Sequence, residues 1–93
     1  MKEMLTKKEL AKEFGMCERT VQSKIGKIEE LQIIRYSPYS VLRSGKTLMC
    51  NVVAFFDFLI FESALTDENL KKHAPKFNYE EAKKQLGFRR NNG

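Results

Sequence analysis

Four polar side chains that follow Glu18 are spaced so that one helical face could present them together. They are Arg19, Thr20, Gln22 and Ser23. A guanidinium can donate two hydrogen bonds to O6 and N7 of guanine, and a glutamine amide can bond N6 and N7 of adenine. The hydroxyl groups add further donors and acceptors. These residue types at this spacing are suited to the base edges that line a DNA major groove, and we expect all four to be base contacts.

Basic side chains flank this group, and such side chains can bind phosphates, which fix position without reading sequence. The chain has 17 Lys and Arg against 12 Asp and Glu, a formal net charge of +5. That excess suits a polyanionic partner, although many proteins of other kinds share it. No acid occurs from residue 32 to residue 51. The expected DNA backbone contacts are Lys7, Lys8, Lys24, Lys27, Arg43 and Lys46.

Two helices over residues 6–30 are needed to position these groups. Thr6 and Glu9 fit a capping box at the start of the first helix, and Gly15 can end it in a left-handed conformation. The second helix is expected from Glu18 to about Glu30. Its inward apolar stripe follows helical spacing and consists of Val21, Ile25 and Ile28.

A β-hairpin over residues 39–50 is expected next, because Gly45 supplies the positive φ that a tight turn between two short strands needs. Arg43 and Lys46 would then lie at its tip. Asn51 can cap an apolar helix over residues 52–64. Short C-terminal helices over 66–86 would follow, with a break at Pro75 and an end at Gly87. The fold class is mainly α with a small β-hairpin, in a single domain over residues 1–88 with a basic disordered tail over 89–93.

The helix from residue 52 is apolar nearly all round, whereas a helix on the surface of a small domain should show one apolar stripe. Such a helix is either covered within its own chain or takes part in a subunit contact. Burial within the chain is the simpler alternative, but large exposed apolar patches commonly mark interfaces. We therefore expect self-association through Phe55, Phe56, Leu59 and Phe61.

The sequence from Leu5 to Ile25 resembles the helix-turn-helix of DNA-binding regulators, with the small Ala11, the turn at Gly15 and the anchor at Val21 in matching places. With the hairpin and the apolar helix included, residues 5–64 resemble the winged helix-turn-helix proteins of the MerR-like type and of phage and mobile-element excisionases. Cys17 is a departure, because Ser or Thr usually caps the recognition helix there, and so is Lys24, whose position is often apolar or small. The chain has no room for a dimerisation helix and an effector domain, which favours the excisionase-like type and no small-molecule effector.

Catalysis, metal binding and membrane insertion find no support in the sequence. His73 is the only histidine, and with Cys17 and Cys50 it makes no metal-ligand spacing. No nucleophile has a base at motif spacing, and Ser44-Gly45-Lys46 lacks the glycine pattern of a phosphate-binding loop. The charged N-terminus is unlike a signal peptide. We expect no enzyme activity, no cofactor, free thiols and a cytoplasmic protein.

The resemblance and the basic hairpin together imply a sequence-specific protein that binds double-stranded DNA. It would be a small transcriptional regulator, or a DNA-architectural accessory factor of a mobile element in excision, transfer or replication control. A homodimer or cooperative assembly on DNA would fit this function, because such regulators commonly bind paired half-sites. The alternative is a protein–protein interaction module that uses the same scaffold without DNA binding, and Glu18, Glu29 and Glu30 favour it.

Overall fold

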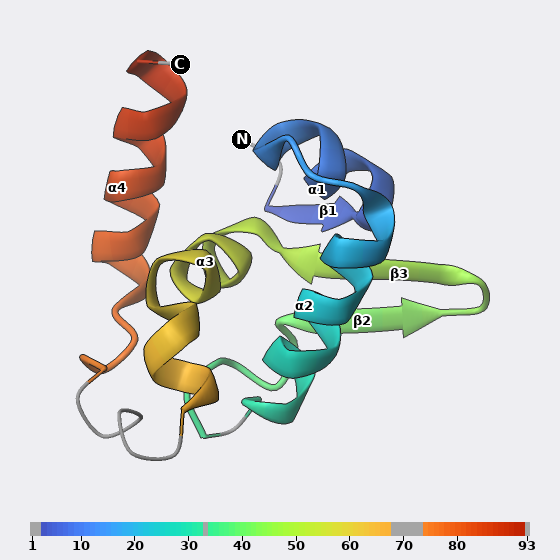
Figure 1. Cartoon of the computed structure of the whole chain (residues 1–93), viewed down its shortest axis with the longest axis horizontal. Helices are drawn as coiled ribbons and strands as arrows, with labels where there is room; N and C mark the ends of the chain where they lie inside the picture. Colours follow the sequence, from blue (N-terminus) through green and yellow to red (C-terminus); the bar gives the residue numbers. More distant parts are fainter. Residues whose placement is uncertain (1–2, 33, 68–73, 93) are drawn as a thin grey trace.

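The computed structural model describes residues 3–32, 34–67 and 74–92. Within that part, four helices accompany one three-stranded antiparallel sheet with the order β1-β3-β2. In Figure 1 the hairpin of β2 and β3 projects beyond the helices on the right, and α4 lies at the opposite side of the molecule. The prediction of a mainly helical chain with a small hairpin agrees with this arrangement. The elements are β1 (Met4–Thr6), α1 (Lys7–Phe14), α2 (Glu18–Glu30), β2 (Val41–Ser44), β3 (Thr47–Asn51), α3 (Val52–Thr66) and α4 (Tyr79–Asn92).

Strand β1 was not expected from the sequence, because three residues are too few to show the alternation that marks a strand. It lies antiparallel to β3, with Leu5 opposite Cys50. Val41 of β2 is opposite Cys50 on the other side. All three of these side chains are buried. The sheet therefore turns one row of apolar side chains toward the helices and joins the N-terminus of the chain to its middle.

Helices α1 and α2 begin and end largely where the sequence places them. The capping box is confirmed, since Thr6 Oγ1 accepts from the amide of Glu9 at 3.2 Å and Glu9 Oε1 accepts from the amide of Thr6 at 2.9 Å. Gly15, with φ 64°, provides the left-handed end of α1. The inward stripe of α2 is also confirmed, because Val21, Ile25 and Ile28 have no exposed surface. A connection of only three residues, 15–17, joins the two helices.

Cys17 stands at the N-cap of α2 but makes no side-chain cap hydrogen bond. Its extended backbone, φ −77° and ψ 157°, is the conformation from which a serine hydroxyl can accept an amide hydrogen of the first turn. Cys17→Ser is therefore expected to raise the free energy of unfolding by about 0.5–1 kcal/mol. Urea titration followed by circular dichroism measures this.

Asn51 provides the matched comparison, because its amide oxygen accepts from the amides of Val53 and Ala54 at 2.9 and 3.0 Å at the start of α3. Asn51→Ala should lower the stability by about 1 kcal/mol. Suppose that Asn51→Ala lowered the unfolding midpoint but Cys17→Ser left it unchanged. The prediction that α2 lacks a stabilising cap at Cys17 would then be wrong.

Helix α3 follows β3 with no connecting residue, since β3 ends at Asn51 and α3 begins at Val52. It extends to Thr66, past the expected end at residue 64, and Phe61 has non-helical φ/ψ within it. Phe55 is completely buried inside the chain, with its ring centroid 5.2 Å from that of Phe14. Its assignment to a self-association surface is therefore wrong. Phe56, Leu59 and Phe61 are partly buried and pack against the same core.

Helix α4 begins as predicted, because Asn78 Oδ1 accepts from the amide of Glu81 at 3.0 Å. It does not end at Gly87 but continues to Asn92. The backbone that we expected to be disordered from residue 89 is therefore helical as far as residue 92. A glycine inside a helix costs only about 1 kcal/mol relative to alanine, and Gly87 does not adopt the positive φ that would end the helix. The helix expected after Thr66 lies mostly in residues 68–73, outside the described residues.

Candidate nucleic-acid interface

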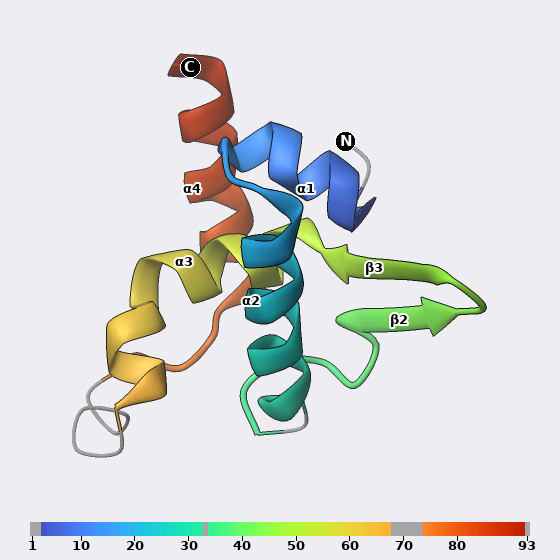
Figure 2. The ribbon, with the colours of Figure 1, turned by 45° about the vertical axis from the view of Figure 1, so that its right-hand side comes forward.

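The four polar side chains expected to act together do lie together. Arg19, Thr20, Gln22 and Ser23 are all exposed on the N-terminal half of α2, while Val21 between them is buried. Helix α1 lies across the N-terminal end of α2, as Figure 2 shows, and leaves this face open. The arrangement presents one guanidinium, one amide and two hydroxyl groups to the outside along a single helix.

Two of these side chains already have partners within the chain. Lys7 Nζ donates to Gln22 Oε1 at 3.2 Å, and Cys17 Sγ lies 3.1 Å from Thr20 Oγ1. Across the described ranges, the side chains of Arg19 and Ser23 have no hydrogen bond or ion pair. The pair of Lys7 and Gln22 could not be foreseen, because the proximity of these residues depends on how α1 meets α2. Cys17 and Thr20 are three residues apart at the start of α2, so their contact is local.

Both cysteines are free thiols, as expected, but their surroundings are opposite. Cys17 is exposed, and its hydrogen bond with the hydroxyl of Thr20 lowers the pKa of its thiol. Burial raises the pKa of Cys50 to about 12. Of the two thiols, Cys17 is therefore the more accessible and the more easily deprotonated.

The hairpin lies where the sequence predicts it, with a turn at Gly45 (φ 59°) and Ser44 opposite Thr47. Lys46 is exposed in this turn. The side chain of Arg43 turns back toward α2. Its Nε and Nη2 donate to the carboxylate of Glu29 on α2 at 3.0 and 2.8 Å, and this contact holds the pKa of Glu29 below its usual range. The side chain of Arg43 thus fastens the hairpin to the C-terminal half of α2.

The four helical lysines expected at phosphates are not equivalent. Lys8 and Lys27 are exposed, and Lys7 is partly buried beside Gln22. Lys24 faces the other way and forms an ion pair with Glu62 of α3, with 16% of its side chain exposed. The structure therefore keeps Lys7 with the polar face of α2 and separates Lys24 from it.

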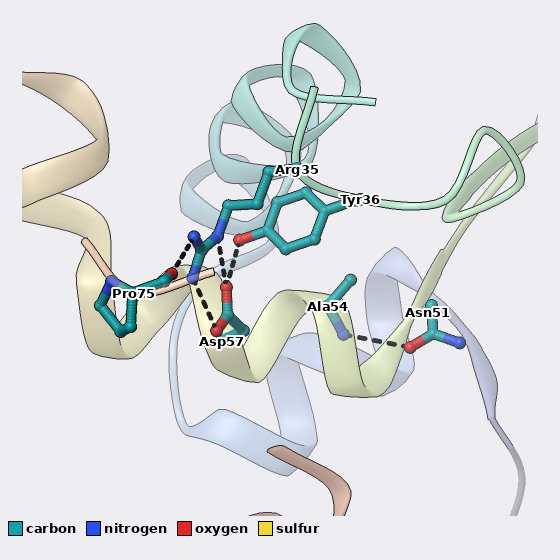
Figure 3. A network of polar contacts seen from close by, with 6 residues as sticks. All are labelled: Arg35, Tyr36, Asn51, Ala54, Asp57 and Pro75. Atoms are coloured by element: carbon teal, nitrogen blue, oxygen red, sulfur yellow. Dashed lines mark hydrogen bonds and ion pairs between the residues drawn. The ribbon is translucent and has the colours of Figure 1, made fainter. Parts of the chain in front are cut away.

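The sequence analysis missed a buried ionic cluster between the connection after α2 and helix α3. Arg35 and Tyr36, in the connection after α2, converge on Asp57 of α3, as Figure 3 shows. Arg35 Nε and Nη2 donate to the two carboxylate oxygens at 3.0 and 3.1 Å, and the Tyr36 hydroxyl donates to Oδ2 at 2.7 Å. Arg35 Nη1 also donates to the carbonyl oxygen of Pro75. The signal was present, because Asp57 is the single charge in the apolar run from Val52 to Phe61.

This cluster fixes the position of α2 relative to α3. The side chains of Arg35 and Asp57 are only 8% and 6% exposed, and the Arg35 guanidinium also lies over the ring of Phe61 at 5.4 Å. Burial and the neighbouring carboxylate raise the pKa of Tyr36 far above its usual range, so its hydroxyl stays a donor at every physiological pH. Arg35 thus belongs to the interior and adds nothing to the basic surface.

Comparison of the chain with protein-family models, curated proteins and solved structures gave no significant match, so its function is inferred from its own residues and geometry. Of the helices in the described ranges, none combines the length and apolar character needed to cross a membrane. The same residues contain no group of three or more His, Cys, Asp or Glu side chains that could hold a metal ion.

Proposed function

We propose that this chain is a winged helix-turn-helix protein that binds duplex DNA with sequence preference through α2. In this proposal α1 and α2 are the helix-turn-helix, and β2 and β3 form the wing. The observation that carries it is the open face of α2, where four hydrogen-bonding side chains stand beside a hairpin that projects from the molecule. A helix of this kind inserts its N-terminal half into the major groove, which is where these side chains lie.

The basic residues divide into two roles. Lys8 and Lys27 are exposed on α1 and α2 and bind phosphates beside the groove, and Lys46 does the same from the hairpin turn. Arg43 contributes indirectly, because its ion pair with Glu29 holds the hairpin against α2. Lys24 has no part in the contact, since it is paired with Glu62 on the α3 side.

The biological class follows from the resemblance noted in the sequence. We propose a cytoplasmic regulator of transcription or an architectural accessory factor of a mobile element, able to assemble as two copies on DNA. Support for the architectural role comes from the projecting hairpin (Figure 2), which in this proposal contacts the DNA backbone beside the groove that α2 reads.

Fluorescence anisotropy of mixed-sequence duplexes across a salt series tests the proposal. Affinity is expected to fall steeply with salt, because bound lysines release counterions from phosphates. Lys46→Glu should weaken every duplex about tenfold or more, since a repulsive charge replaces a phosphate contact. Arg19→Ala should weaken the preferred duplex by about 1–3 kcal/mol and relax the preference at one base pair.

Lys76→Glu is the matched control for Lys46→Glu. Lys76 is exposed and lies three residues before the start of α4, and the substitution changes the net charge by the same amount. It should alter the affinity far less than Lys46→Glu. Absence of binding to any duplex at low salt would contradict the proposal, and equal effects of the two charge reversals would contradict the role of the hairpin.

One observation favours the alternative function, a protein-interaction module. Ile60 is 50% exposed, at a groove between α3 and α4 that Phe61 and Ala82 also line. In that case size-exclusion chromatography with light scattering would show a stable complex, which Ile60→Glu would disrupt, and no duplex would bind. The open polar face of α2 favours DNA binding over this function, because an interaction surface usually has an apolar centre.

A further inference from the structure

The hydrogen bond between Lys7 and Gln22 constrains how α2 can read a base. Lys7 is the first residue of α1, and its position is fixed by the capping box of Thr6 and by the packing of α1 on α2. Its ammonium group donates to the amide oxygen of Gln22 at 3.2 Å. One lone pair of the amide oxygen is therefore engaged by another side chain at the protein surface, while the NH2 group of Gln22 keeps both of its donors for an outside partner.

Adenine is a poor partner for a glutamine held in this way. Bidentate bonding of adenine requires the amide oxygen to accept from N6 and the NH2 group to donate to N7. Lys7 uses one of the two lone pairs of this oxygen and places a positive charge beside it, and that charge opposes the approach of the N6 donor. Guanine presents acceptors only, at N7 and O6, so it accepts from the free NH2 group and is attracted by the same charge.

We propose that Lys7 is a positioning residue that makes Gln22 select guanine over adenine. The inference rests on the proposed function, in which α2 lies in the major groove. It replaces the adenine contact expected from the type of residue 22 alone. Lys7 acts through Gln22, and its role differs from that of a lysine that only neutralises a phosphate.

Binding of a duplex library randomised over the recognition site tests this, with the relative affinity for guanine and adenine measured at each position. The wild type should prefer guanine at the position that loses its preference in Gln22→Ala. Lys7→Met removes the hydrogen bond and the charge while keeping the length of the side chain. It should shift the ratio of guanine to adenine at that position about tenfold toward adenine, and Lys7→Arg, which can still donate, should retain the guanine preference.

Lys12→Met is the control, because Lys12 is exposed on the same helix and takes no part in the bond. It should leave the ratio unchanged. A preference for adenine in the wild type would overturn the inference, as would a Lys7→Met variant that is weaker on all sequences without any change in ratio. Either result would leave DNA binding itself intact, whereas binding to no duplex would overturn both proposals. Circular dichroism of each variant separates unfolding from a change in preference.

Discussion

Asp57→Ala is expected to lower the free energy of unfolding by about 3–5 kcal/mol, which is a large part of the stability of a small domain. The substitution leaves the Arg35 guanidinium buried without its carboxylate, and it removes the acceptor of the Tyr36 hydroxyl. Both groups then lose their hydrogen-bond partner at a largely buried position. Urea or thermal unfolding followed by circular dichroism measures the loss, and a variant that is unfolded before denaturant is added satisfies the expectation.

Glu29→Ala is the matched control, because Glu29 also receives two donors from an arginine, but at the surface. It should cost no more than about 1 kcal/mol. The double variant Arg35→Met/Asp57→Leu should be less damaging than the sum of its two single variants, since no unpaired charge remains. If Asp57→Ala and Glu29→Ala had equal effects, the buried cluster would have no special part in stability.

Phe55→Ala is expected to cost about 3–5 kcal/mol for a different reason. Phe55 is completely buried, and its ring packs against that of Phe14 where α3 meets the end of α1. Removing the ring loses the transfer free energy of its carbons and leaves a cavity that the surrounding helices cannot fully close. Chemical denaturation should show a lower midpoint with the same cooperativity.

Ile60→Ala serves as the comparison on the same helix, because Ile60 is half exposed. It should change the stability by less than about 1 kcal/mol. A small effect of Phe55→Ala together with a loss of self-association would restore the original assignment of Phe55 to an interface between chains.

Local patterns were sufficient for much of this fold. The capping box of Thr6 and Glu9 and the stop at Gly15 are interactions between residues a few positions apart, so the sequence displays them directly. The hairpin turn at Gly45 is equally local. The exposure of Arg19 and Gln22 also followed, because the buried stripe of α2 fixes which face is left outside.

What the sequence missed depends on contacts between distant residues. Strand β1 forms because Leu5 pairs with Cys50 of β3. A strand of three residues is too short to show a periodic pattern in the sequence. The burial of Arg35 was missed because nothing near it in the sequence reveals the carboxylate 22 positions away. Helix α3 was recognised as too apolar for a surface, but periodicity alone does not say whether its own chain or a second copy covers it.

The absence of any residue between β3 and α3 has a mechanical consequence. At that junction the amide of Val52 donates to the carbonyl of Glu3 at 2.8 Å, and the amide of Asn51 donates to that of Ser40 at 2.7 Å. The base of the hairpin is therefore clamped on both sides and continues directly into the most buried helix of the protein. The packing of the core therefore sets the orientation of the hairpin. A partner that binds the hairpin does not have to order a flexible loop, so little binding free energy is lost to conformational entropy.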